Sequence, residues 1–164
     1  MTRAVLSLGA NLGDRLAALQ AAVDALAERV VVVAVSPVYE TAPVGGVIQD
    51  DFLNAVALVD TDLPPRELLA YAHEVELAAG RVRGERWGPR TLDIDLVAYG
   101  SVVSADPDVT LPHPRAHERA FVLVPWLDVD PSAALPALGA VAALLPFADG
   151  DVRRCDDLVL TVPA

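Results

Sequence analysis

The chain has 164 residues, of which 54% are hydrophobic, enough for the buried core of one domain. It carries 23 acidic and 12 basic residues, and every basic residue is arginine. The net charge of −11 argues against nucleic acid as the main partner, which would need a basic face, and the absence of lysine excludes a Walker-type phosphate loop. The longest apolar tract, 133–148, is interrupted by two prolines, and the N-terminal residues have no signal pattern, so we expect a cytoplasmic protein that does not bind membranes.

Six elements are predicted before residue 100 from hydrophobic periodicity and turn residues. They are strand 4–8, helix 14–29, strand 30–38, strand 52–59, helix 64–79 and a strand that contains Asp93 and Asp95 and ends at Tyr99. Asp14 is a suitable cap for the first helix, and Gly80 a suitable end for the second. Residues 102–103 and 109–110 predict a small hairpin.

The order of these elements predicts an α+β fold. It is the order of a ferredoxin-like βαββαβ core, with an antiparallel-rich sheet covered by helices on one face and a C-terminal extension. We expect a single domain over 1–164, in which about 131–164 form a variable extension.

A Gly- and Pro-rich segment, residues 80–90, carries four arginines and a tryptophan directly before the last predicted strand. The guanidinium group is a rigid fork of donors that can grip phosphate oxygens at two points. This segment therefore predicts a phosphate-binding loop.

Two carboxylates follow this loop on a strand. Because side chains alternate along a strand, Thr91, Asp93 and Asp95 share one face, while residues 92, 94 and 96 point into a core. Because Asp93 and Asp95 are two residues apart on the strand, their Cβ atoms are separated by roughly 6–7 Å. That spacing suits two metal ions about 3.5–4 Å apart, held between the two carboxylates. Mg²⁺ is the natural ion because it prefers oxygen ligands and keeps phosphates in its shell. By itself, an Asp-x-Asp pair on a strand favours a half-buried strand with a solvated outer face. Next to the arginine-rich loop, the same pair favours a site for a metal-bound polyphosphate.

The segment RWGPRTLDIDLV (86–97) resembles the signature of the 6-hydroxymethyl-7,8-dihydropterin pyrophosphokinase family. The resemblance continues, in the family's order, through LGANLGD (8–14), SPVYETAP (36–43), FLNA (52–55), LPHP (111–114) and RAF (119–121). It implies an enzyme that moves the terminal pyrophosphate of ATP to the hydroxymethyl group of a reduced pterin and releases AMP. It also implies a monomer whose partners are these small molecules.

The resemblance implies roles for individual residues. Asp93 and Asp95 match the carboxylates that hold two Mg²⁺ ions, and Arg81 and Arg90 match the arginines that close over the phosphates. Nucleotide contacts are implied at Glu76, Arg83, Arg86, Trp87, Leu96, Thr110, His113 and Arg119. Pterin contacts are implied at Gly9, Thr41, Ala42, Pro43, Val44, Phe52, Asn54 and Phe121.

Several of these residues have a simpler interpretation. Glu76 fits a solvated helix face, His113 a turn between prolines, Phe121 the core, Trp87 an anchor of its own loop, and Gly9 a strand end. Two other functions use the same motifs: a metal-dependent phosphohydrolase, and a non-catalytic nucleotide-sensing module, because a fold alone does not settle function.

Overall fold

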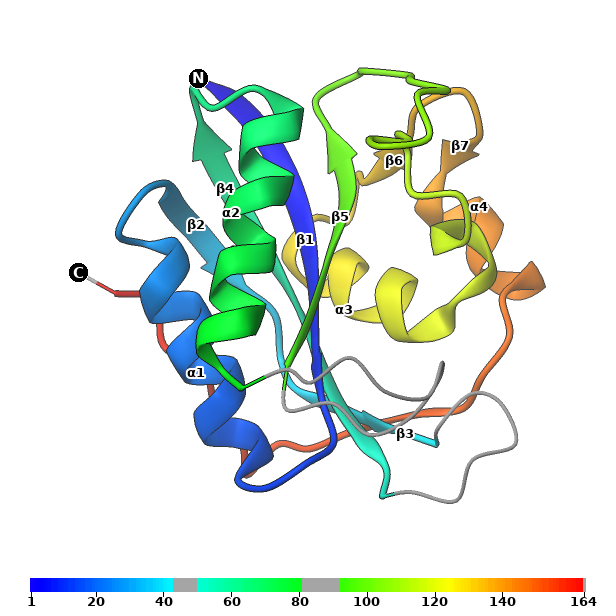
Figure 1. The fold of residues 1–164 in the computed structure, drawn as a ribbon. Helices are drawn as coiled ribbons and strands as arrows, with labels where there is room; N and C mark the ends of the chain where they lie inside the picture. The colour runs from blue at the N-terminus through cyan, green and yellow to red at the C-terminus, as the bar shows by residue number, and fades with distance from the viewer. Residues whose placement is uncertain (43–49, 81–91, 164) are drawn as a thin grey trace.

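The computed structural model describes residues 1–42, 50–80 and 92–163 (Figure 1). The first half of the chain forms β1 (Thr2–Ala10), α1 (Arg15–Leu26), β2 (Val31–Val35), β3 (Tyr39–Thr41), β4 (Phe52–Thr61), α2 (Pro65–Ala78) and β5 (Asp93–Tyr99). The second half forms η1 (Ala116–Glu118), α3 (Ala120–Val129), β6 (Ala134–Leu135), β7 (Gly139–Ala140), α4 (Val141–Leu144), η2 (Leu145–Phe147) and β8 (Val152–Arg154). All six elements predicted before residue 100 are present, with shifted boundaries and one division.

The main sheet has the strand order β5-β1-β4-β3-β8, and β2 also pairs with β4. Every pairing between its strands is antiparallel. The prediction of an α+β fold with an antiparallel-rich sheet is therefore confirmed. Among the described residues, no helix combines the length and hydropathy that a membrane-spanning helix requires.

Side-chain alternation gives the sheet two buried faces. The even-numbered positions of β1 from Ala4 to Ala10 belong to the larger hydrophobic cluster, which packs under α1 and α2. Val5 and the β4 residues Val56 and Leu58 belong to a second cluster with Leu123 and Trp126 of α3. Figure 1 shows α1 and α2 on one face and α3 on the other. The expectation that helices cover only one face is wrong, because α3 covers the second.

Local signals explain where the first two helices begin and end. The Asp14 side chain accepts a hydrogen bond from the Ala17 N–H at 3.1 Å and caps α1. Proline at the first position of α2 needs no N–H partner, and Gly80 after α2 has a φ of +85°, which glycine adopts without strain.

The segment 30–38 is not one strand, as its β-branched run predicts. It divides into β2 and β3 around Ser36, whose hydroxyl accepts the Val56 N–H and whose own N–H donates to the Val56 carbonyl, both at 2.8 Å. A side-chain bond thus replaces one backbone bond of the ladder between the end of β2 and the start of β3. In the predicted hairpin, the described contact is a bridge between Ser104 and Leu111 rather than two strands.

The C-terminal region contributes more than the sequence predicts. Its strand β8 pairs with β3, with Tyr39 opposite Arg154 and Thr41 opposite Val152. The extension therefore supports the strand that carries Thr41.

Candidate functional site

A row of directly opposed residues crosses four strands on one face of the sheet. Asp93 of β5 lies opposite Gly9 of β1, Gly9 lies opposite Asn54 of β4, and Asn54 lies opposite Tyr39 of β3. Directly paired residues in antiparallel strands project to the same side. Asp95, two residues further along β5, is on this side as well. The register thus brings the paired carboxylates and the predicted pterin residues Gly9 and Asn54 together.

Gly9 lies between Asp93 and Asn54 in this row, at a point where there is little room for a side chain. A Cβ atom there would lie 3.1 Å from Oδ1 of Asn54 and 3.6 Å from Cδ1 of Phe52. Nδ2 of Asn54 donates to Oγ1 of Thr41 at 2.7 Å, and both residues are buried. The structure therefore gathers four of the predicted pterin residues, and the exposed Ala42 follows directly after Thr41.

His113 and Arg119 converge on Asp95 from the segment before α3. Nε2 of His113 lies 3.9 Å from Oδ1 of Asp95, and Nη1 of Arg119 lies 3.8 Å from Oδ2. Both distances are longer than a hydrogen bond, so the two groups are close polar neighbours of Asp95 rather than hydrogen-bond donors to it.

His113 is held as a neutral donor beside Asp95. Burial and then the positive charge of Arg119 lower the pKa of His113 to about 4, against the opposing charge of Asp93. Nδ1 accepts the Arg115 N–H at 3.2 Å, so the imidazole proton of the neutral ring is on Nε2, which faces Asp95. The backbone N–H of His113 donates to the Val97 carbonyl at 2.9 Å, which ties this segment to β5.

Phe121, in the first turn of α3, lies beside Arg119. The Arg119 guanidinium carbon is 5.5 Å from the centre of the Phe121 ring, within the range of a cation–π contact. Ala120, which lies between these two residues, donates its N–H to the carbonyl of the sequence-distant Asp149 at 3.0 Å. The predicted nucleotide residue Arg119 and the predicted pterin residue Phe121 are therefore neighbours.

Glu76, Leu96 and Thr110 lie apart from this face. Glu76 is 2% exposed, and its Oε2 accepts the N–H of Ile94, between the two aspartates, at 2.7 Å; the solvated alternative is wrong. The Leu96 side chain is buried in the cluster on the opposite face. Thr110 donates to the Asp106 carbonyl at 3.0 Å. Any contact of Leu96 with a ligand on the aspartate face would have to use its main chain.

The remaining predicted site residues lie outside the described residues. They are Pro43, Val44, Arg81, Arg83, Arg86, Trp87 and Arg90.

Asp93 and Asp95 fit Mg²⁺ as a donor set, because they present carboxylates from one side of β5 and both are partly exposed. Across the residues with a described structure, no group of three or more His, Cys, Asp or Glu side chains could hold a metal. Two carboxylates suffice for Mg²⁺, which takes its other ligands from water and substrate phosphates.

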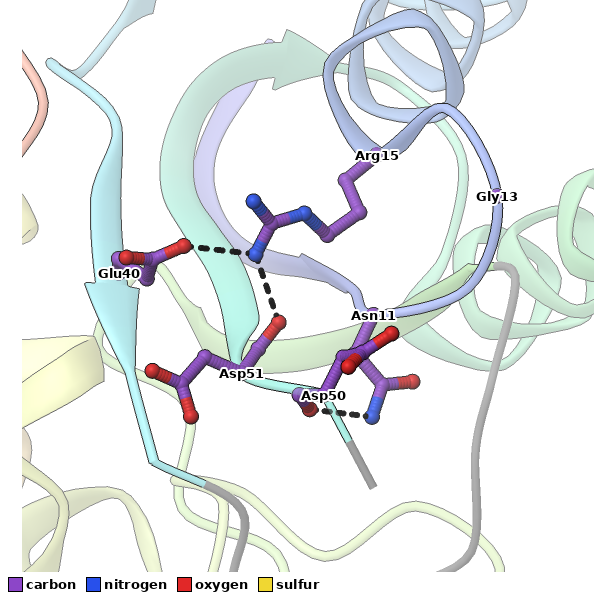
Figure 2. Close-up of a pocket in the computed structure, with 6 residues that line it drawn as sticks. All are labelled: Asn11, Gly13, Arg15, Glu40, Asp50 and Asp51. Atoms are coloured by element: carbon purple, nitrogen blue, oxygen red, sulfur yellow. Dashed lines mark hydrogen bonds and ion pairs between the residues drawn. The ribbon is translucent and has the colours of Figure 1, made fainter.

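The structure adds residues near the row that the motifs did not single out. Tyr39 is buried, and its hydroxyl donates to Oδ2 of Asp128 on α3 at 2.5 Å; burial and then this bond raise its pKa to about 12. A cavity of about 460 Å³ lies at the nearby end of β3 and β4 (Figure 2). It is lined by Asn11, Gly13, Arg15, Glu40, Asp50 and Asp51. Asn11 and Glu40 fall inside the blocks that resemble the family, but only the fold shows that they line the same cavity.

Comparison with known proteins identifies first an enzyme class and then a family. The curated relatives are pyrophosphokinases, which are ATP-dependent diphosphotransferases. The family model for 7,8-dihydro-6-hydroxymethylpterin-pyrophosphokinase (HPPK) matches residues 5–131, and the chain belongs to this family.

Individual relatives cover most of the chain. The 2-amino-4-hydroxy-6-hydroxymethyldihydropteridine pyrophosphokinase of Mycobacterium tuberculosis is 52% identical over 149 residues, covering 85% of this chain and 78% of the relative. The enzyme of the same name from Methylorubrum extorquens is 47% identical over 158 residues, covering 95% of this chain and all of the relative (100%). A solved structure of Plasmodium falciparum HPPK-DHPS with pterin and p-hydroxybenzoate matches with a TM-score of 0.68 at 15% identity. That match covers 88% of this chain but 41% of the longer Plasmodium chain, and it shows a shared fold.

Proposed function

We propose that this chain transfers the pyrophosphoryl group of ATP to the hydroxymethyl group of 6-hydroxymethyl-7,8-dihydropterin, in folate biosynthesis. Membership of the HPPK family supports the reaction. The observation that carries the residue assignment is the row in which Asp93, Gly9 and Asn54 lie in register. This register supports a carboxylate site for the metal-bound phosphates of ATP beside a surface formed by Gly9, Asn54 and Phe52 for the flat pterin ring.

On the nucleotide side, Asp93 and Asp95 would hold Mg²⁺, with two ions expected from the resemblance. When bound, Mg²⁺ neutralises phosphate charge and acidifies a coordinated hydroxyl. The His113 Nε2–H and the Arg119 guanidinium lie within 4 Å of the Asp95 carboxylate, where they can donate to phosphate oxygens. A neutral His113 remains a donor at physiological pH, because its lowered pKa keeps the ring from titrating there.

On the pterin side, the Phe52 and Phe121 rings offer apolar faces for stacking, and Asn54 offers an amide. Because Nδ2 of Asn54 donates to Thr41, its Oδ1 is directed over Gly9. That oxygen can accept an N–H from the edge of the pterin ring, and the missing side chain of Gly9 allows the ring to approach. Hydrogen bonding at the ring edge and stacking on its faces together orient the hydroxymethyl group.

We also propose the finer architecture. The order β5-β1-β4-β3 with antiparallel neighbours supports a ferredoxin-like core made of β1, α1, β2 with β3, β4, α2 and β5. The pairing of β8 with β3 supports one domain over the whole chain. Solution mass measurements should show a monomer.

One assay tests the function: ATP, Mg²⁺ and the pterin alcohol are mixed, and the nucleotides are separated. AMP should form one-for-one with the pterin pyrophosphate, without ADP. Asp95→Ala should lose at least about a hundredfold in rate, because metal coordination is worth several kcal/mol. Arg119→Ala should raise the KM for ATP about tenfold, the effect of a lost charge-assisted bond. Asp62→Ala, at a carboxylate 80% exposed beside the N-terminus, is the matched control and should be unchanged.

The rival functions give different results in the same assay. A phosphohydrolase would release phosphate without the pterin alcohol. A nucleotide-sensing module would bind ATP without turnover, so neither AMP nor the pterin pyrophosphate would form. Substantial activity of Asp95→Ala would contradict the metal assignment.

A further inference from the structure

Arg15 makes contacts that its place in α1 does not explain. It is the first residue of α1, where the helix dipole disfavours a positive charge. Its side chain nevertheless turns away from the helix toward the ends of β3 and β4. Nη1 donates to Oε2 of Glu40 and to the main-chain carbonyl of Asp51, both at 2.8 Å (Figure 2).

Neighbouring bonds extend this arrangement. The side chain of Asn11, which is 2% exposed, donates from Nδ2 to the Asp50 carbonyl at 3.0 Å. Glu40 also forms an ion pair through Oε1 with Arg153 of β8, the residue opposite it in the ladder. We call Asn11, Arg15, Glu40 and the carbonyls of residues 50 and 51 the Arg15 clasp.

The Arg15 clasp lies at the end of the described β3–β4 ladder. The last paired residues of β3 and β4 are Thr41 and Phe52. Glu40 directly precedes Thr41, and Asp51 directly precedes Phe52, so Arg15 joins the two strands next to this pair. The ion pair is largely shielded, with side-chain exposures of 29% for Arg15 and 18% for Glu40, so solvent weakens it less than a surface pair.

The clasp therefore adds a side-chain tie to the backbone ladder between the two strands that form the proposed pterin surface. Thr41 holds Asn54 through its hydroxyl, and Phe52 lies over the open position at Gly9. If Glu40 and Asp51 move apart, Thr41 and Phe52 move with them, whereas Asp93 and Asp95 lie on β5, beyond β1.

We propose that Arg15 is a positioning residue for the pterin substrate. It acts through Glu40 and the Asp51 carbonyl, and touches neither ATP nor the reacting atoms. This proposal rests on the proposed function, since it names a further residue of the same site. The Arg15 clasp reaches the main chain at both residues, Asp50 through Asn11 and Asp51 through Arg15, so it fixes the path of the backbone rather than particular side chains there. In Figure 2 the Asp51 carboxylate points away from the Arg15 guanidinium.

The test compares Arg15→Ala and Arg15→Lys with the wild-type chain. The Kd of the pterin alcohol is measured by pterin fluorescence with Mg²⁺ and α,β-methylene-ATP present, and the Kd of that nucleotide is measured separately. Arg15→Ala should weaken pterin binding about tenfold, the equivalent of one lost charge-assisted hydrogen bond, and change nucleotide binding less than about twofold. Arg15→Lys should recover part of the loss, because an ammonium can donate to both partners but lacks the reach of arginine.

Two further variants keep the result interpretable. Arg3→Ala removes an exposed arginine–aspartate pair with Asp60 on β1 and β4, and should leave both Kd values unchanged. Glu40→Gln removes the charge from the Arg15 contact but keeps an acceptor oxygen, and should give a smaller loss of pterin affinity. It replaces Arg15→Ala in the test if that variant does not fold.

Wild-type pterin affinity in Arg15→Ala or, if that variant does not fold, in Glu40→Gln overturns the proposal. Equal weakening of pterin and nucleotide overturns it as well, because that pattern indicates general destabilisation. If the wild-type chain binds the pterin alcohol and forms AMP while the clasp variants behave as wild type, only the clasp is wrong. If the wild-type chain does neither, the proposed function fails first.

Discussion

Replacing Gly9 with alanine should separate substrate binding from stability. The new methyl group would lie 3.1 Å from Oδ1 of Asn54, about 0.3 Å inside the 3.4 Å at which ordinary contacts begin, and 3.6 Å from Phe52. The Asn54 amide has to move, although it is held by Thr41 at 2.7 Å. The methyl and the displaced amide then occupy the surface over which we place the pterin ring.

The effect on folding should be small because two terms oppose each other. Alanine in a strand interior is favoured over glycine by roughly 0.5–1 kcal/mol, since the unfolded chain has less freedom to lose. Straining the Asn54–Thr41 bond removes part of a hydrogen bond worth about 0.5–1.5 kcal/mol. The free energy of unfolding of Gly9→Ala should therefore stay within about 1 kcal/mol of wild type.

The effect on binding should be large, because no term in the complex compensates for it. Overpacking by one methyl group costs about 1–3 kcal/mol, which corresponds to a pterin Kd raised about five- to 150-fold. Fluorescence titration with the pterin alcohol and urea unfolding measure the two quantities on the same protein.

Gly100→Ala is the matched contrast. Gly100 has a φ of +53°, and a Cβ there would lie 3.0 Å from Cγ2 of Thr2, at the far end of β1. It should lose about 1–2 kcal/mol of stability and keep its pterin affinity. A Gly9→Ala protein with wild-type pterin affinity would refute the placement of the ring.

Two further predictions concern the supports of the site. Tyr39 has a native pKa raised to about 12, so its bond to Asp128 stabilises the fold fully below pH 10 and less as pH rises toward 12; chemical unfolding of Tyr39→Phe should show a flatter decline over that window than wild type. Glu76→Ala leaves the Ile94 N–H without its buried acceptor and should lower the free energy of unfolding in urea by about 2–4 kcal/mol. Glu76→Gln keeps an acceptor and should cost less, and equal losses in the two variants would contradict this role.

Local patterns in the sequence predict the elements well but not their pairing. Alternation correctly places Asp93 and Asp95 on the face opposite Ile94, because period two is a property of any strand. Alternation does not say that Gly9 lies opposite both Asp93 and Asn54, since register depends on long-range packing. The irregularity between Val5 and Leu6 in the β1–β5 pairing shifts that register and has no local signal.

Local sequence patterns also fail to predict the burial of a polar side chain and two of the later elements. Glu76 on an amphipathic helix reads as solvated, yet it is buried because an N–H of the edge strand β5 needs an acceptor at that point. The helix α3 was not predicted, because it is apolar nearly all round and contains Pro125, so it has no polar face to mark its period. The strand β8 is three residues long and rich in arginine, and only its partner β3 makes it a strand.

The helix α3 and the residues before it also help to position the candidate site. The cluster under α3 takes Val5, Val56 and Val97 from the second face of the sheet. The row of Asp93, Gly9, Asn54 and Tyr39 lies beyond that cluster, on the same face. The segment leading into α3 then brings His113 and Arg119 to Asp95, and the hydroxyl of Tyr39 ties the helix to the row through Asp128. The segment before a helix that the sequence does not predict thus brings two N–H donors to the acidic strand, so α3 supports the candidate site as well as the core.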